Sequence, residues 1–220
     1  MRRFPTIFIT TLALALPLLA VASDNDIDKI NGAVQVEAGQ HAGNVSTVNG
    51  SVHIADGAMV QKVSTVNGSV ELGSKAQALE VGTVNGGIDL AGGSQVSGEV
   101  SATNGHIHLD TGADIRGKLD NVNGAIVLQG AHVGGGIRTV SGDITVGDNS
   151  HVEGGILVEK SSSWFNWNSR DPLVVIGPHA VVQGTLEFRG EVVLKVSDSA
   201  QIGPVKGATV VKFSGAMPTN

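Results

Sequence analysis

An Asn-Gly dipeptide recurs along this chain at nearly constant intervals. It begins at Asn31, Asn49, Asn67, Asn85, Asn104 and Asn123, and Ser141-Gly142 takes the next position. The successive intervals are 18, 18, 18, 19, 19 and 18 residues, and two apolar residues in alternation follow each pair. A short fixed repeat of this kind indicates a solenoid, in which each unit buries its apolar side only by stacking on its neighbours.

A finer period of six residues lies within the longer repeat. The apolar residues at this spacing are Ile30, Val36, Ala42, Val48, Ile54, Val60, Val66, Leu72, Ala78, Val84, Leu90 and Val96. Three such hexads fill one 18-residue coil, so we expect three short faces per coil, with these residues pointing into the core. Gly and β-branched residues dominate the repeat and disfavour helices, which excludes a helical solenoid.

The Asn-Gly pairs are expected to lie at corners between faces. Asn-Gly is also a common hairpin turn, but every unit repeats with the same polarity, which favours parallel stacking over hairpins. Gly tolerates positive φ, so each pair can turn the chain. Equivalent Asn side chains in such a stack lie about 4.8 Å apart, and their amides can form a hydrogen-bonded ladder. The predicted ladder consists of Asn31, Asn49, Asn67, Asn85, Asn104 and Asn123.

These patterns predict an all-β fold, a single-stranded parallel β-helix with about nine coils of 18–19 residues. We favour a right-handed coil over a left-handed one, because right-handed crossovers are the general preference. In addition, bulky residues such as Val63 and Val81 lie out of phase with the six-residue repeat, which disfavours a left-handed coil built from regular hexads. The extra residues of the longer coils are expected in loops rather than in strands.

The chain divides into four expected segments. They are a signal peptide at 1–22, a polar lead-in at 23–29, the solenoid at 30–213 with an inserted loop at 160–172, and a tail at 214–220. Solenoids need capped ends, and we expect the bulky side chains of Phe188 and Phe213 to close the C-terminal end.

Composition and the N-terminal segment indicate export. Arg2 and Arg3 precede an apolar stretch of residues 7–21 that is shorter than the ~20 residues of a membrane span, and small residues precede Ser23. We therefore expect a cleaved signal rather than an anchor, no membrane span after cleavage, and a periplasmic or secreted protein. Loss of two Arg and no acid changes the net charge from −6 to −8, which argues against nucleic-acid binding. The absence of Cys excludes disulfides and thiolate metal sites.

The glycine-punctuated Val-Asn-Gly-Ser-Val repeats resemble bacterial β-helical families. The likeness is to bactofilin-like polymer-forming proteins and to adhesin-like β-solenoids of bacterial envelopes, and it covers roughly residues 30–158 and 173–213. Bactofilin-like proteins are generally cytoplasmic, so the signal peptide departs from that family. The hexads also resemble left-handed hexapeptide-repeat proteins, many of which are acyltransferases.

An aromatic insertion interrupts the repeat. Trp164, Phe165 and Trp167 lie within four residues of one another, close to Arg170. Aromatic rings stack on sugars and on partner side chains, and loops on rigid scaffolds commonly carry function. These four residues are therefore the candidate binding site. The alternative is that the loop packs against an apolar flank of the solenoid.

Other polar residues give weaker indications. Asp89, His106 and His108 are expected on one face of adjacent coils, where such a trio can bind a divalent metal if its geometry allows. Mixed polar columns are also the ordinary exterior of a solenoid, and we expect no metal and no other cofactor. Acidic residues are scattered, and no nucleophile triad, phosphate-binding loop or dinucleotide motif is present. We therefore expect no enzymatic activity.

Together these features predict an exported, non-catalytic β-solenoid with a structural, adhesive or scaffolding role in the bacterial cell envelope. Candidate partners are an envelope polysaccharide, another protein, or further copies of the chain. The alternative is a polysaccharide-binding or polysaccharide-acting protein, and a hexapeptide-type acyltransferase is a less favoured one.

Overall fold

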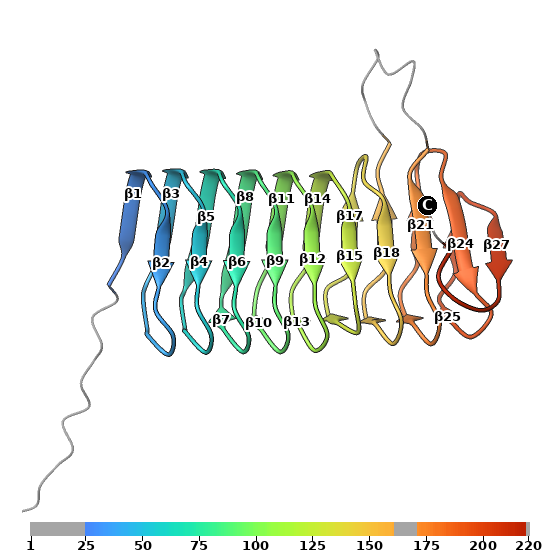
Figure 1. The fold of residues 1–220 in the computed structure, drawn as a ribbon. Coiled ribbons are helices and arrows are strands. Elements are labelled where there is room, and N and C mark those ends of the chain that lie inside the picture. Colours follow the sequence, from blue (N-terminus) through green and yellow to red (C-terminus); the bar gives the residue numbers. More distant parts are fainter. Residues whose placement is uncertain (1–24, 161–170, 219–220) are drawn as a thin grey trace, which may run out of the picture.

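The computed structural model describes residues 25–160 and 171–218, and within them the chain forms a β-solenoid with no helix (Figure 1). Three sheets run along the rod, and the chain passes through them in turn to complete about nine coils. All named strand pairs are parallel, which confirms the expected parallel β-helix with three faces. The handedness of the coil stays a prediction, and the expected signal peptide lies outside the described residues.

Sheets A, B and C are named here in the order in which the chain enters them. Sheet A contains β1 (Ile27–Asn31), β3 (Val45–Asn49), β5 (Lys62–Asn67), β8 (Glu80–Asn85), β11 (Val100–Asn104), β14 (Leu119–Asn123), β17 (Ile137–Thr139), β20 (Ile156–Val158), β23 (Leu186–Phe188) and β26 (Val205–Lys206). Sheet B contains β2 (Val34–Val36), β4 (Val52–Ile54), β6 (Val70–Leu72), β9 (Ile88–Leu90), β12 (Ile107–Leu109), β15 (Ile126–Leu128), β18 (Ile144–Val146), β21 (Leu173–Ile176), β24 (Val193–Ser197) and β27 (Val210–Phe213). Sheet C contains β7 (Gln77–Ala78), β10 (Gln95–Val96), β13 (Asp114–Ile115), β16 (His132–Val133), β19 (His151–Val152), β22 (Val181–Val182) and β25 (Gln201–Ile202).

The core is a narrow stack of aliphatic side chains inside the coil. Each rung contributes equivalent residues, so that Val34 lies over Val52 and Val52 over Val70 in sheet B. These side chains are almost completely buried. Because identical positions stack, each apolar side chain packs against its own repeats above and below, which is why the sequence period sets the fold.

The predicted hexad core is wrong in one of its three columns. In sheet A the inward residues are Val45 and Thr47 and their repeats, whereas the hexad residues point outward. The outward residues and their exposed fractions are Ile30 72%, Val48 42%, Val66 40% and Val84 40%. The physical reason is that the faces are unequally spaced: Val45 to Val52 is seven residues, Val52 to Val60 is eight, and Val60 to Val63 is three. Dividing the coil evenly into hexads therefore predicts the wrong residues of sheet A to point inward.

The glycines of the Asn-Gly corners are needed for close stacking more than for positive φ. Positive φ occurs at Gly32 and Gly124, among others, but not at Gly50 or Gly68. A Cβ atom at Gly68 would overlap the carbonyl oxygen of Gly50 one rung earlier. The same overlap recurs at the other corner glycines after the first, so the corner admits no side chain at this position.

Irregularities in coil length lie at corners, as expected. Ser97-Gly98-Glu99 joins sheet C to sheet A where the preceding rung uses only Leu79 and Glu80 before Val81. The larger insertion also leaves the strands intact, because it lies between β20 of sheet A and β21 of sheet B. Both strands pair with their neighbours on either side.

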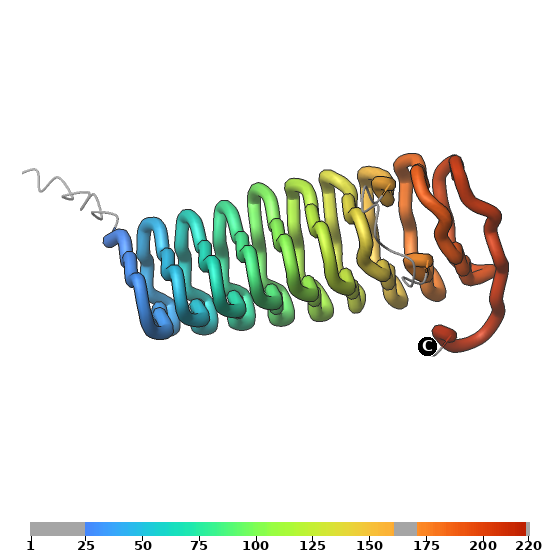
Figure 2. The backbone as a smooth tube through the Cα atoms, turned by 90° about the horizontal axis from the view of Figure 1, so that it is seen from above, coloured from blue at the N-terminus to red at the C-terminus, as the bar shows by residue number. Residues whose placement is uncertain are grey.

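The ends of the solenoid differ in part from expectation. The first strand begins at Ile27, so residues 27–29 of the predicted lead-in belong to the first rung, where Ile27 pairs with Val45 and contacts the core. At the other end Phe188 is buried and Phe213 is half-buried in the last strand. The tail after Phe213 folds back along the rod (Figure 2), and Met217 lines a shallow hollow there with Thr145 and Asp148. The described residues contain no helix of the length and apolarity of a membrane span.

Candidate functional site

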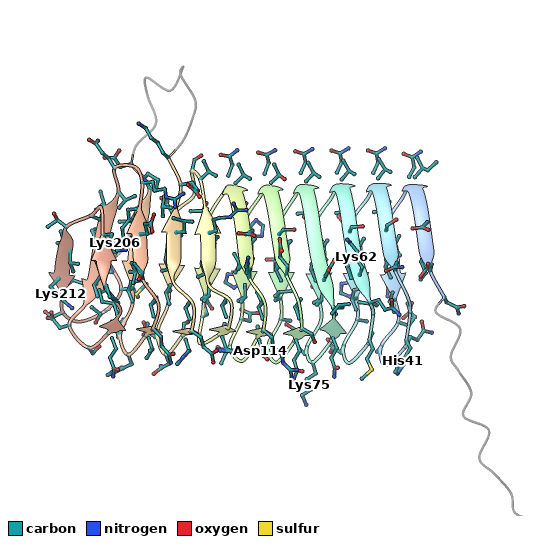
Figure 3. The ribbon with its side chains drawn as sticks, turned by 180° about the vertical axis from the view of Figure 1, so that it is seen from behind. His41, Lys62, Lys75, Asp114, Lys206 and Lys212 are labelled. Atoms are coloured by element: carbon teal, nitrogen blue, oxygen red, sulfur yellow. The ribbon has the colours of Figure 1, made fainter. Side chains whose placement is uncertain are left out.

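The corner between sheets A and B carries the predicted amide ladder. Each Asn Nδ2 donates to the Oδ1 of the Asn one rung earlier, and Figure 3 shows the resulting row of side chains along this corner. The five distances, from Asn49–Asn31 to Asn123–Asn104, are 3.0, 2.9, 3.0, 3.1 and 3.0 Å. Ser141 ends the column, where its Oγ donates to Asn123 Oδ1 at 2.7 Å. All six predicted Asn residues thus take part in one continuous ladder.

Backbone hydrogen bonds fix the same corner. The amide nitrogen of Gly50 donates to the carbonyl of Asn67 at 2.9 Å, and Gly68 repeats the contact with Asn85. Beneath the corner, Thr65 Oγ1 donates to the carbonyl of Gly50 at 2.9 Å. Backbone, ladder and buried hydroxyl therefore hold each corner to the next, which makes this edge of the rod rigid.

Exposed aliphatic side chains lie directly beside the ladder. Val48, Val66, Val84 and Val122 each precede a ladder Asn and point outward from sheet A. We call this column the valine ridge. The sequence pattern assigned three of these residues to the core, so the ridge is a surface that sequence reasoning missed.

The aromatic insertion interrupts the chain at this same A–B corner. Lys160 and Asp171 flank it, two rungs beyond the last Asn of the ladder. The predicted binding residues Trp164, Phe165, Trp167 and Arg170 lie outside the described residues. The residues at the base of the insertion line a hollow of about 690 Å³. Its polar lining residues include Ser141, Asp143, Glu159, Lys160, Asp171 and Glu191.

Ion pairs organise the charged groups around this hollow. Arg189 Nη1 donates to Glu159 at 2.9 Å, and its Nε donates to Glu187 at 2.8 Å. Hydrogen bonds to Glu187 and then to Glu159 raise the pKa of the Arg189 guanidinium. Asp143 Oδ1 accepts the backbone N–H of Leu173 at 2.8 Å, which fixes the chain as it re-enters sheet B. The base of the insertion is therefore anchored on both sides of the corner.

A second hollow, of about 470 Å³, lies on the outer surface of sheet A. Asp120, Arg138 and Leu157 line it from successive rungs. Arg138 Nε donates to Asp120 at 2.8 Å, and this hydrogen bond is the main reason why the pKa of Arg138 is raised. The pair places one fixed cation and one fixed anion beside an apolar side chain.

The predicted trio of Asp89, His106 and His108 separates into two pairs. Asp89 and His108 are neighbours across adjacent rungs, as expected from the repeat. The imidazole that contacts Asp89 is nevertheless that of His106, at 3.1 Å, while His108 Nε2 lies 3.0 Å from Asp110. Among residues 25–160 and 171–218 no group of three His, Asp or Glu side chains is arranged to hold a metal ion.

A different polar cluster lies on sheet C. His132 Nδ1 lies 2.5 Å from Asp114 Oδ1, and His132 Nε2 lies 3.3 Å from Glu153. The ring of His151 lies beside that of His132, with centroids 5.6 Å apart and ring planes tilted by 53°. The 18-residue spacing of Asp114 and His132 is the signal that could have found this contact, because the repeat makes such residues neighbours.

Comparison of the chain with protein-family models, with curated proteins and with solved structures found no match.

Proposed function

We propose that the protein is an exported, non-catalytic β-solenoid that acts as a rigid scaffold in the bacterial cell envelope. The observation that carries this proposal is the continuity of the A–B corner, where a single amide ladder joins seven rungs from Asn31 to Ser141. Parallel sheets on all three sides and a closely packed aliphatic core resist bending of the rod. Such a rod holds an attached group at a fixed distance from its ends.

The attached group in this proposal is the aromatic insertion. It interrupts the A–B corner, and the strands before and after it keep their pairing partners on both sides. Its base is fixed by the bond from Leu173 to Asp143 and by the Arg189–Glu159 pair. Trp164 and Trp167 then serve as the contact residues for an envelope glycan or a protein partner.

Binding experiments on the exported protein test this role. Cell-wall fractions, purified peptidoglycan and envelope extracts are incubated with the wild type and with the variant Trp164→Ala/Trp167→Ala. We expect the variant to lose retention at least tenfold, because stacked Trp residues dominate such contacts. The matched control, Ser162→Ala/Ser163→Ala, alters the same segment without removing a ring and should bind as the wild type does. Equal retention of all three proteins would overturn the docking role.

Polysaccharide binding is the second candidate, and the hollow at the base of the insertion favours it. Its carboxylates, including Asp171 and Glu191, can accept hydrogen bonds from sugar hydroxyls. A glycan array separates the candidates, because a glycan-binding protein retains defined oligosaccharides when no protein is present. Release of shortened chains from a bound polysaccharide would instead indicate an enzyme and contradict the non-catalytic proposal.

A further inference from the structure

At each end of the rod, one inward-facing column of the solenoid ends in lysine. Lys29 in β1 is paired with Thr47, and Thr47 with Thr65, which are buried residues of the same column of sheet A. Lys212 in β27 is paired with Val196, and Val196 with Ile176, which are buried in sheet B. Each lysine thus occupies, in the terminal rung, a position that every neighbouring rung fills with a buried residue.

Both lysines are exposed at the open ends. Lys29 Nζ donates to the carbonyl of Ala33 at 2.9 Å within its own rung. Figure 3 shows Lys212 at the C-terminal tip of the rod, and Lys206 lies in β26, the last strand of sheet A. Beyond these strands the described residues provide no further rung, so the terminal strands β1, β2, β26 and β27 each have one unpaired edge.

Apart from the lysines, the two ends match each other. If the first rung of a second copy continued the ladder beyond β26, Ile27 would lie on Val205 and Asp28 on Lys206. These pairs follow from the columns that place Ile27 with Val45 and Leu186 with Val205. In sheet B, Val34 would likewise lie on Val210. The ends therefore have matching apolar positions and one matching pair of opposite charges.

The lysines oppose this stacking. In the same arrangement Lys212 would be enclosed against Val36, and Lys29 would be enclosed against Gly207, within one apolar interior. Enclosing an ammonium group without a charged partner costs much more free energy than an exposed pair such as Asp28–Lys206 returns. Inward-pointing charges are a known means of protecting exposed strand edges.

We propose that Lys29 and Lys212 are end caps that block a latent head-to-tail interface between copies of this chain. The protein is then a single rod of fixed length, and self-association through its ends is suppressed. This inference does not depend on the proposed docking role, because it concerns only the terminal rungs.

The residues paired with each lysine in the neighbouring rung provide the substitutions that test the caps. In Lys29→Thr/Lys212→Val each lysine is replaced by the residue that its neighbouring rung carries. Light scattering on the exported protein should show the wild type as a monomer at all concentrations and the double variant as multimers that lengthen with concentration. Lys195→Val is the matched control: it removes a lysine that pairs with Val211 and points outward, and it should stay monomeric.

Two further measurements establish the geometry. A mixture of the single variants Lys29→Thr and Lys212→Val offers one uncapped head and one uncapped tail, so it should form a one-to-one dimer and stop there. In the double variant, adding Asp28→Lys should reduce multimers, and adding Lys206→Asp as well should restore them. A wild type that already stacks end to end would overturn the proposal. So would a mixture of folded single variants, verified by circular dichroism, that remains monomeric.

Discussion

At the scale of the residue, most of the buried Thr and Asn side chains of sheet A bond to carbonyl groups of the A–B corner. Thr65 and Thr83 each donate to the corner carbonyl one rung earlier, at 2.9 and 3.0 Å. Asn121 replaces Thr in its rung and donates to two glycine carbonyls. Thr139 occupies the same column, and within the described part of the chain its buried Oγ1 has no partner.

This difference predicts opposite effects for one kind of substitution. Thr139→Val keeps the side-chain shape and removes an unsatisfied hydroxyl, so the free energy of unfolding should rise by about 1 kcal/mol. Thr65→Val removes a made hydrogen bond and should lower it by about 1 kcal/mol. Urea denaturation followed by circular dichroism measures both. Shifts in the same direction would contradict the assigned roles.

The ladder gives a second prediction at this scale. Asn67 takes part in two amide–amide bonds, at 2.9 and 3.0 Å, whereas Asn31 at the end takes part in one. Asn67→Ala should therefore lower the free energy of unfolding by about 1 kcal/mol and Asn31→Ala by about half as much. The ratio of the two losses is the measurement, and a larger loss at Asn31 would be inconsistent with the ladder.

At the scale of the element, strands β3, β5, β8 and β14 of sheet A each separate a buried pair of residues from an exposed pair at the corner. In β5, Val63 and Thr65 face the core, while Val66 and Asn67 face solvent at the corner. The strand is long because it must carry the chain from the core to the ladder. Because Val66 and its repeats face solvent here, they form the valine ridge.

Two Val→Ala variants within β5 test which side chains of the strand face the core. Val63→Ala removes two buried methyl groups and should lower the free energy of unfolding by about 2 kcal/mol. Val66 is 40% exposed, so Val66→Ala should cost about 0.5 kcal/mol or less. Thermal and urea melts of both variants provide the comparison. Equal losses would support the hexad pattern of the sequence over the observed orientation.

At the scale of the whole molecule, the rungs are nearly interchangeable. Residues of β5 and β8 pair at a spacing of 18, as do those of β3 and β5. Each rung contacts mainly its two neighbours, so the stability of the rod is close to a sum over rungs and their interfaces. The rung that carries the insertion and the two terminal rungs, with their lysines, depart from this pattern.

Removal of one whole rung should therefore be tolerated. Deletion of residues 64–81 joins Val63 to Gly82, which is the equivalent of Ser64 in the next rung. We expect a folded rod shorter by about 4.8 Å, with a modestly lower melting temperature. Small-angle scattering measures the length. Deletion of residues 64–72, half a coil, joins non-equivalent positions and should unfold the protein; an equally stable product would contradict the rung model.

The sequence alone determined the parallel stack, its three faces, the placement of extra residues at corners and the Asn ladder. All of these follow from one property, that residues one period apart become neighbours, and the period is written in the chain. It also located the aromatic insertion, although not its contacts.

Only the tertiary structure decided which valines point inward in sheet A, because the faces are unequally spaced and an even hexad cannot report that. It also decided that the corner glycines are required by close stacking, since the clash is with a residue one rung away. The partners of His106, His108 and His132 depend on side-chain reach across rungs rather than on position alone. The lysine caps also became visible only in the structure, because the register of the stacked rungs decides which residues end each column.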